Sequence, residues 1–351
     1  MPSSSTLLYK RKRTDVFDRV KTLKLLGLTT VLGLAIILTC TLSLLLGAKA
    51  IDATTVFNSL FHGATGSDSL IILESRLPRT LAGLVCGSAL AVSGTLIQAL
   101  TRNAMADPGI LGVNSGASFF ILIGIVFFDA SGIQQYIWFA FAGSLVTALM
   151  VFTIGSSNTS GMNPVRLILA GVALSAVMSG ISSGISLLNI TAYDQMRFWE
   201  AGSLDVRNLK LTAISAIPVI LGLILAFIVA QPLNNIGMGE EVATSLGTSV
   251  RTTQFFCLIA ITLLCGGATA LAGPIGFVGL MVPHFSRWLV GNDQRHILFF
   301  SMLLGPLLVL NSDIVGRLIV NSELRVSVVT AFIGAPLLIL LIRKNASFGK
   351  L

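Results

Sequence analysis

Residues 234–251 read Asn234-Asn235-Ile236-Gly237-Met238-Gly239-Glu240-Glu241-Val242-Ala243-Thr244-Ser245-Leu246-Gly247-Thr248-Ser249-Val250-Arg251 and separate two long apolar runs. The stretch is too polar to cross a bilayer. It is also longer than a link between two membrane helices needs, because helix–helix connections commonly have about 2–8 residues. Its length and polarity together indicate a surface that something outside the membrane contacts.

The middle of this stretch has the chemistry of a short helix. Glu240 and Glu241 suit a first turn, because carboxylates favour the positive end of the helix dipole. Gly247 suits the position just after the last turn, where glycine adopts a left-handed conformation without strain. We predict a short surface helix that presents Ala243, Thr244 and Leu246 to a cytoplasmic partner. A solvated linker without a partner is the alternative interpretation.

The composition places the chain in a membrane. Of its 351 residues, 54% are hydrophobic and 11% are charged, whereas a soluble domain has roughly a quarter charged residues. The net charge of +8 therefore does not indicate a nucleic-acid partner, and much of it lies before residue 25. The four cysteines lie in apolar runs without disulfide or zinc-ligand spacing, and the three histidines are scattered. We predict no metal site.

Ten apolar runs approach the length of about 20 residues that crosses a hydrocarbon core of about 30 Å. They lie at 25–47, 77–100, 109–128, 137–155, 165–188, 210–230, 251–272, 274–290, 297–314 and 326–343. The third and the eighth are the least regular, because Gly and Pro interrupt them. We predict an all-α polytopic membrane protein with about ten transmembrane helices. The first run exceeds the roughly 7–15 residues of a signal-peptide core, so we expect it to remain as a span.

The positive charges predict the orientation. With ten spans and an inner N-terminus, the inner segments carry 15 of the 23 Lys and Arg residues and the outer segments carry the other eight. This bias agrees with the positive-inside rule and places both termini in the cytoplasm. The chain then divides into a basic cytoplasmic N-terminus at 1–24, a ten-helix transmembrane domain at 25–343 with a cytoplasmic loop at 231–251, and a cytoplasmic tail at 344–351.

The predicted spans lack groups that would supply energy or chemistry inside the membrane. Their interiors contain essentially no ionisable residue, whereas ion-driven carriers place such residues near the midplane. The sequence also lacks the Gly-x-x-x-x-Gly-Lys-Ser/Thr loop that cradles nucleotide phosphates and the residue sets of intramembrane enzymes. We predict no catalytic residue, and energy for active transport would come from another chain. An ion-coupled secondary transporter is the alternative of another class.

Several blocks resemble the permeases of iron-siderophore and vitamin B12 ABC importers. They are Arg76-Leu77-Pro78-Arg79-Thr80-Leu81-Ala82-Gly83, residues 101–117, residues 166–174, and Gly273-Pro274-Ile275-Gly276-Phe277-Val278-Gly279-Leu280-Met281-Val282-Pro283-His284. The polar stretch at 234–251 resembles the coupling helix of the same family. Because the blocks occur in the same order over nearly the whole chain, they are more specific than any single motif. The resemblance implies the type II ABC importer permease fold.

Two further stretches resemble the D-type subunits of ferric enterobactin permeases. They lie at 193–209 and 323–336. The second contains Leu324-Arg325-Val326-Ser327 where the B12 permease has Leu-Pro-Ile-Gly, and this difference disfavours B12. The resemblance therefore implies import of a ferric siderophore, most closely ferric enterobactin or a similar catecholate. Heme or vitamin B12 import is the alternative within the family.

The resemblance also implies partners. A second, different permease subunit would complete a heterodimer, two ABC ATPase subunits would lie below it, and a periplasmic substrate-binding protein would deliver the ferric siderophore from above. The chain would lie in a bacterial inner membrane among lipids and bind no nucleic acid. It would hold no cofactor, since ATP and Mg belong to the ATPase.

The resemblance assigns three groups of residues. Contact with the ATPase is expected at Gly239, Glu240, Glu241, Ala243, Thr244, Leu246 and Gly247. Docking of the binding protein is expected at Arg76, Arg79, Arg317 and Arg325, where guanidinium groups would pair with glutamates. Anchoring to lipid headgroups is the alternative role of these arginines. A cytoplasmic gate is expected at Asn163 and Pro164.

Overall fold

The computed structural model describes residues 4–47, 49–63, 66–157, 161–162, 164–206, 208–320 and 323–347. The helices, in chain order, are α1 (Ser4–Leu45), α2 (Ala53–Phe61), α3 (Ser67–Leu70), the π-helix η1 (Ile71–Arg76), α4 (Leu77–Thr101), the 3-10 helix η2 (Pro108–Leu111), α5 (Val113–Phe128), α6 (Ile133–Gly155), α7 (Pro164–Leu188), α8 (Ile190–Glu200), α9 (Leu209–Gly237), α10 (Glu240–Ser245), α11 (Val250–Ala272), α12 (Val278–Val290), α13 (Gln294–Ile319) and α14 (Val326–Ser347). Two short antiparallel strands, β1 (Ser156–Ser157) and β2 (Gly161–Met162), precede α7.

Every predicted apolar run is helical over most of its length, but fewer helices are long enough to span. Among the described residues, 7 helices have the length and hydropathy to cross a membrane: α1 from Thr22, the continuous helix from α3 to α4, and α6, α7, α9, α11 and α13. The helices α5 and α12 and the described apolar part of α14 are shorter. The structure confirms a helical multi-pass membrane protein, and the number of about ten spans is not confirmed.

The backbone explains why the two irregular runs give short helices. Gly112 has a φ of 73°, so the chain turns after η2 and α5 begins only at Val113. Phe277 has a φ of 69°, in the left-handed region, so α12 begins at Val278 rather than near Pro274. Both helices therefore lose a turn to a loop within the bundle.

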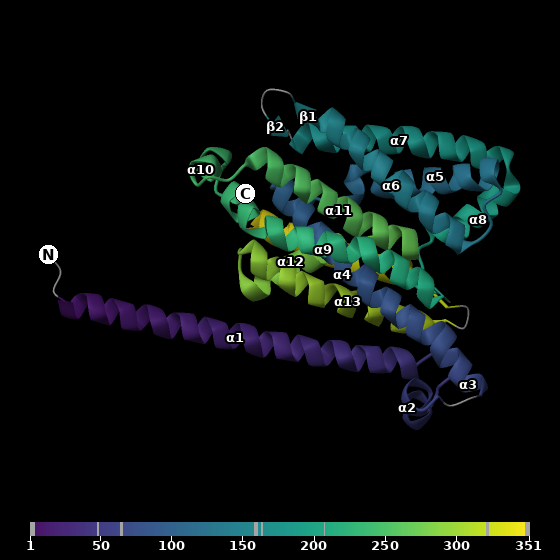
Figure 1. Ribbon diagram of the computed structural model, residues 1–351, viewed down its shortest axis with the longest axis horizontal. Coiled ribbons are helices and arrows are strands. Elements are labelled where there is room, and N and C mark those ends of the chain that lie inside the picture. Colours follow the sequence, from purple (N-terminus) through teal and green to yellow (C-terminus); the bar gives the residue numbers. More distant parts are fainter. Residues whose placement is uncertain are drawn as a thin grey trace.

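The helices form a bundle whose two ends carry different short elements (Figure 1). The helix α10 and the strands β1 and β2 lie at the end from which α1 starts, which we call the α10 end. The short helices α2, α3 and α8 lie at the opposite end, which we call the α8 end. The loops predicted to share one side of the membrane thus share one end of the bundle.

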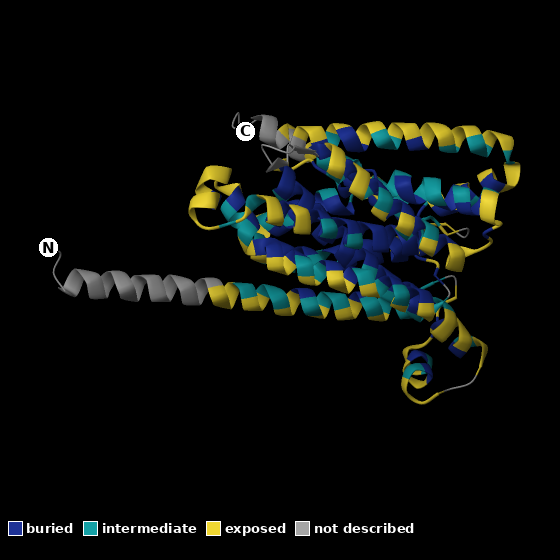
Figure 2. Cartoon of the chain, turned by 45° about the horizontal axis from the view of Figure 1, so that its top comes forward, coloured by how far each residue is buried: buried dark blue, intermediate teal, exposed yellow. Residues whose placement is uncertain are grey.

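The helix α4 is the centre of the bundle, and the long helices at its rim are more exposed (Figure 2). Of the most apolar window of the helix from Ser67 to Thr101, 83% is buried, against 6% for α1 and 22% for α7. Small residues let the neighbours of α4 approach closely. Gly87 lies against the backbone of Gly305 and Pro306 in α13, and Gly94 lies against Gly279 in α12.

The contact at Gly94 predicts a large effect from one methyl group. A Cβ on Gly94 would lie 2.0 Å from the carbonyl oxygen of Gly279, so two helices must separate to accept it. We expect Gly94→Ala to lower the free energy of unfolding by about 1–3 kcal/mol or more, measured by denaturant titration in detergent. Gly184→Ala is the control, because a Cβ on that helical glycine would meet no atom within 4 Å outside its own stretch of helix. Equal stability of the two variants would contradict the packing described.

Candidate functional site

The predicted surface helix exists as α10, with the expected start and end. Glu240 and Glu241 occupy its first turn, and Gly247 follows it with a φ of 79°. The amide of Gly247 donates to the carbonyl of Thr244 at 2.9 Å, and the amide of Thr248 donates to the carbonyl of Ala243 at 2.9 Å. These two bonds close the helix as a left-handed glycine cap does. Gly239 precedes it with a φ of 119°.

The face that α10 exposes differs in part from the predicted one. Leu246 is 59% exposed and Thr244 is also exposed, as predicted, but Ala243 is fully buried and faces the bundle. Met238 and Val242, which the sequence analysis did not select, are 69% and 43% exposed. Met238 follows the end of α9, Val242 lies within α10 and Leu246 comes directly after it, so the three exposed apolar side chains surround α10. We call Met238, Val242 and Leu246 the α10 patch.

Polar contacts connect the surroundings of α10 to three long helices. A guanidinium nitrogen of Arg102, just after α4, lies 3.5 Å from a carboxylate oxygen of Glu240. Near the end of α9, the side-chain amide of Asn234 donates to Asp293 at 2.9 Å and accepts from the backbone amide of Gln294, at the start of α13, at 2.8 Å. Glu240 thus connects α10 to the end of α4, and Asn234 connects α9 to the start of α13.

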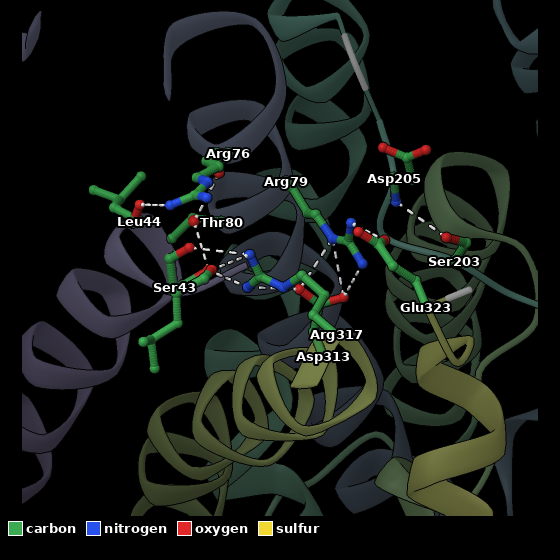
Figure 3. A network of polar contacts seen from close by, with 11 residues as sticks. Ser43, Leu44, Arg76, Arg79, Thr80, Ser203, Asp205, Asp313, Arg317 and Glu323 are labelled. Carbon is green, nitrogen blue, oxygen red and sulfur yellow. Dashed lines mark hydrogen bonds and ion pairs between the residues drawn. The ribbon is translucent and has the colours of Figure 1, made fainter. Parts of the chain in front are cut away.

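At the α8 end, a buried network of charges joins helices that are far apart in the sequence (Figure 3). The guanidinium of Arg79 donates to Asp313 at 2.9–3.1 Å and to Glu323 at 2.8 Å. A guanidinium nitrogen of Arg317 also lies 3.0 Å from Oδ2 of Asp313. Asp313 is fully buried, so its charge is compensated by two arginines rather than by water. We call Arg76, Arg79, Asp313, Arg317 and Glu323 the arginine cluster.

Two arginines of the cluster also complete the end of α1 (Figure 3). Arg76 donates to the carbonyl oxygens of Leu44 and Leu45 at 2.6 and 2.8 Å, and also to that of Lys49. Arg317 donates to the carbonyl oxygens of Ser43 and Leu46, both at 3.1 Å. The last carbonyls of a helix lack partners within it and carry its negative dipole end. The two guanidinium groups therefore hold the end of α1 on α4 and α13.

These contacts bear on the predicted docking residues. A guanidinium that pairs with a partner protein has to reach the surface, but Arg76, Arg79 and Arg317 are only 5%, 6% and 6% exposed. Their contacts within the chain give them a structural role. Arg325 is half-buried and lies over the ring of Phe198, with its guanidinium carbon 5.6 Å from the ring centroid. Arg197, which is exposed, lies over the same ring at 5.1 Å.

The predicted gate falls largely outside what the structure describes. Asn163 lies outside the described residues, and Pro164 is described only as the first residue of α7. Of the tail at 344–351, the last four residues also lie outside the description. Within the described residues, no group of three or more His, Cys, Asp or Glu side chains has the arrangement to hold a metal ion.

A polar cavity of about 790 Å³ lies among α5, α7 and α8. Six serines contribute hydroxyl groups to two of its walls: Ser115 and Ser118 from α5, and Ser179, Ser182, Ser183 and Ser186 from α7. The α7 serines are spaced i, i+3, i+4 and i+7, so they share one face of the helix. Tyr193, Arg197 and Glu200 of α8 complete the polar lining. This cavity was not predicted, although the serine spacing in α7 is visible in the sequence.

Glu200 is the carboxylate of this cavity, and its environment favours the neutral form. Partial desolvation raises the pKa of the Glu200 carboxyl, and a hydrogen bond with Ser118 opposes that shift. A raised pKa means that ionisation costs more in the folded chain than in the unfolded chain. Stability is therefore lost as the pH rises above the ordinary range of a glutamate, about 4.3.

The raised pKa of Glu200 predicts how the thermal stability of Glu200→Gln depends on pH. The amide is never ionised, so the variant should melt at a higher temperature than the parent at pH 8 and at nearly the same temperature at pH 4. Because Glu200 also faces solvent in the cavity, we expect a gain of only about 1–2 °C at pH 8. Thermal unfolding in detergent at both pH values measures it. An equal gain in melting temperature at both pH values would contradict the raised pKa of Glu200.

Known proteins are similar to this chain over most of its length. The family model described as the FecCD transport family matches residues 35–344. The chain belongs to the FecCD transport family. Among FecCD relatives, it is 51% identical over 316 residues to the ferric enterobactin transport system permease protein FepD of Escherichia coli, covering 90% of this chain and 95% of FepD.

Other FecCD relatives and a solved structure are also similar over nearly the whole chain. The probable siderophore transport system permease protein YfiZ of Bacillus subtilis is 37% identical, with 89% of this chain and 96% of YfiZ covered. The hemin transport system permease protein HmuU of Yersinia pestis is 35% identical, with coverages of 86% and 90%. An inward-facing metal-chelate type ABC transporter matches with a TM-score of 0.79 and 28% identity, covering 92% of this chain and 99% of its own.

Proposed function

We propose that the chain is the transmembrane permease subunit of an ATP-binding cassette importer that moves a ferric siderophore of the catecholate type into the cytoplasm. The 51% identity with FepD over 90% of the chain carries this proposal. The FecCD relatives of known name are permeases. The chain itself performs no reaction on its substrate.

The polar cavity among α5, α7 and α8 suits passage of a ferric catecholate. Such a complex presents oxygen atoms, which accept hydrogen bonds from the hydroxyl groups of Ser115, Ser182 and Ser186. A typical hydrogen bond contributes only about 0.5–1.5 kcal/mol net. A wall of hydroxyl groups therefore holds the complex weakly and lets it leave, as a transport pathway requires.

A second permease subunit would close this cavity. The helix α7 carries exposed apolar side chains beside its serines, including Val177 at 57%, Ile181 at 48% and Leu187 at 84%. An apolar rim beside a polar hollow suits contact with another permease whose matching helix completes the chamber. We propose a heterodimer, as implied by the resemblance of residues 193–209 to the D-type subunits of ferric enterobactin permeases.

The energy would enter at α10. An ATPase in the cytoplasm binds the α10 patch, with Gly239, Glu240, Glu241, Thr244 and Gly247 shaping that surface. Movement of α10 then biases α4, α9 and α13 through Arg102 and Asn234. Two conformations of the bundle with different access to the cavity are sufficient for alternating access, provided that ATP favours one of them.

The orientation and the remaining partners follow from the same proposal. The α10 end and both termini lie in the cytoplasm, in the inner membrane of a bacterium, and the α8 end faces the periplasm. A substrate-binding protein docks there on Arg325 and on Arg197, which carry positive charge to the surface around Phe198. Asn163 and Pro164 remain proposed as the cytoplasmic gate. The chain binds no cofactor, and ATP and Mg belong to the ATPase.

Reconstitution tests the proposal. The chain, its partner permease, its ATPase and its binding protein are placed together in vesicles, and ATP-dependent uptake of ferric enterobactin, heme and cobalamin is measured. We expect uptake of the ferric catecholate alone. Preferred uptake of heme or cobalamin would replace the proposed substrate, and uptake driven by a proton gradient without ATP would reject the class.

A further inference from the structure

An apolar groove runs along the outside of the bundle between α6, α9 and α11. Its volume is about 300 Å³, and its walls include Trp138 of α6, Ile217 and Pro218 of α9, and Gly267 of α11. Every lining side chain except that of Ser215 is apolar, or belongs to glycine or proline. All three helices are candidate membrane spans. Such a groove faces the bilayer rather than the polar cavity on α5, α7 and α8.

The groove is elongated. A second apolar hollow of about 50 Å³ lies along α6 and α11 and shares Leu263 with the first. From Ile137 to Phe152 in α6 and from Ala270 to Phe255 in α11, the two hollows follow the same pair of helices from the α8 end toward the α10 end. A long, narrow apolar site of this shape accepts a flexible hydrocarbon chain.

A basic side chain, that of Lys210, lies near the end of the groove at the start of α9, which we call its mouth. Lys210 is exposed and precedes Ile214, Ile217 and Leu221 of the groove wall by 4, 7 and 11 positions, so it lies on the same face of α9. It stands at the start of α9, where that helix reaches the membrane surface. Lysine at this level binds lipid phosphate groups, with about 1 kcal/mol per residue.

The groove lining also contains one hydroxyl group, near the end of α9 that carries Lys210. Ser215 lines the groove, is 3% exposed, and its hydroxyl has no hydrogen-bond partner in the described part of the chain. It lies five residues beyond Lys210, or about 7.5 Å further along the helix axis. In a phospholipid, the ester carbonyls follow the phosphate in the same direction and provide the acceptor. Trp138, which is 62% exposed, suits the interface region beside them.

We propose that this groove is a phospholipid-binding site, with an acyl chain between α6, α9 and α11, an ester carbonyl at Ser215 and the phosphate at Lys210. An anionic phospholipid is the preferred ligand, because Lys210 lies at the mouth and none of the residues that line the groove is acidic. The proposal does not depend on the substrate that the chain transports.

Photo-labelling tests the site. The full chain is reconstituted in vesicles of phosphatidylethanolamine and phosphatidylglycerol that contain phosphatidylglycerol with a diazirine in one acyl chain. After irradiation, the labelled peptides are mapped by mass spectrometry. We expect the label to concentrate at 137–141, 214–221 and 263–270. Label spread evenly over all bilayer-facing helices would overturn the proposal.

Matched variants separate the parts of the site. Ile217→Trp fills the groove and removes the concentrated label, whereas Ile220→Trp, on the same helix but outside the lining, retains it. Lys210→Gln lowers the preference for phosphatidylglycerol over phosphatidylethanolamine about fivefold, and Lys210→Arg retains it. Equal labelling of the two tryptophan variants would refute the groove, and an unchanged lipid preference in Lys210→Gln would refute the phosphate contact.

Discussion

Asp313→Asn is expected to lower the free energy of unfolding by about 3–5 kcal/mol. Asp313 is fully buried and forms ion pairs with both Arg79 and Arg317. An amide of the same size removes the negative charge and leaves two buried guanidinium groups facing each other. Removing one partner of a buried ion pair costs far more than the pair gains, because the remaining charge cannot return to water. Denaturant titration of the purified chain in detergent measures the loss.

Two further variants at the same end of the bundle are controls for this result. Glu323 is partly exposed, so Glu323→Gln should cost no more than about 1 kcal/mol. Asp52 is exposed and makes no side-chain capping bond, so Asp52→Asn should be within about 0.5 kcal/mol of the parent. A loss at Asp313 that is no larger than the loss at Glu323 would show that water compensates these charges.

Leu246→Asp is expected to abolish ATP-driven uptake while the chain still folds. Leu246 is 59% exposed directly after α10, so the fold does not depend on it, but the proposed ATPase contact does. An interface residue of this kind contributes at least about 2 kcal/mol, or roughly 30-fold in affinity. We expect the ATPase to dissociate during purification. Copurification and uptake in vesicles measure the two effects.

A matched substitution separates this result from a general effect of charge. Phe61 of α2 is 71% exposed and lies at the opposite end of the bundle. Phe61→Asp makes the same kind of change without touching α10, and it should leave the copurified ATPase unchanged. If Leu246→Asp keeps both the ATPase and uptake, α10 is not the point at which energy enters.

The sequence predicted those elements whose start, end or type depends on residues close to one another in the chain. The start and the end of α10 follow from Glu240, Glu241 and Gly247, and each apolar run became a helix. The length of a helix was less predictable. Where Gly112 and Phe277 adopt positive φ values, the chain turns inside an apolar run, and hydropathy does not record that turn. The number of about ten spans therefore stays a prediction, because three of the apolar runs give helices shorter than a standard span.

Contacts between residues far apart in the chain could not be predicted from local sequence patterns. Arg79 and Asp313 are 234 positions apart, and nothing near either residue indicates the other. The arginines were consequently read as surface groups, although the fold buries Arg76, Arg79 and Arg317. The inward direction of Ala243 also depends on how α10 rests on the bundle. In contrast, the i, i+3, i+4 and i+7 spacing of the α7 serines is enough to predict that they share one face of the helix.

The contacts that Arg76 and Arg317 make with the end of α1 have a consequence for the order of events during synthesis. The last carbonyls of α1 depend on Arg317, which lies 274 positions after Ser43. During synthesis, most of the chain must leave the ribosome before that partner exists. The first helix therefore enters the membrane early, and until α13 is made its end is held only by earlier segments, through contacts such as those of Arg76 and Thr80. Completion of the outer surface of the molecule is thus a late step of biogenesis, and nascent chains that end before Asp313 should leave α1 accessible to cross-linkers in the surrounding bilayer.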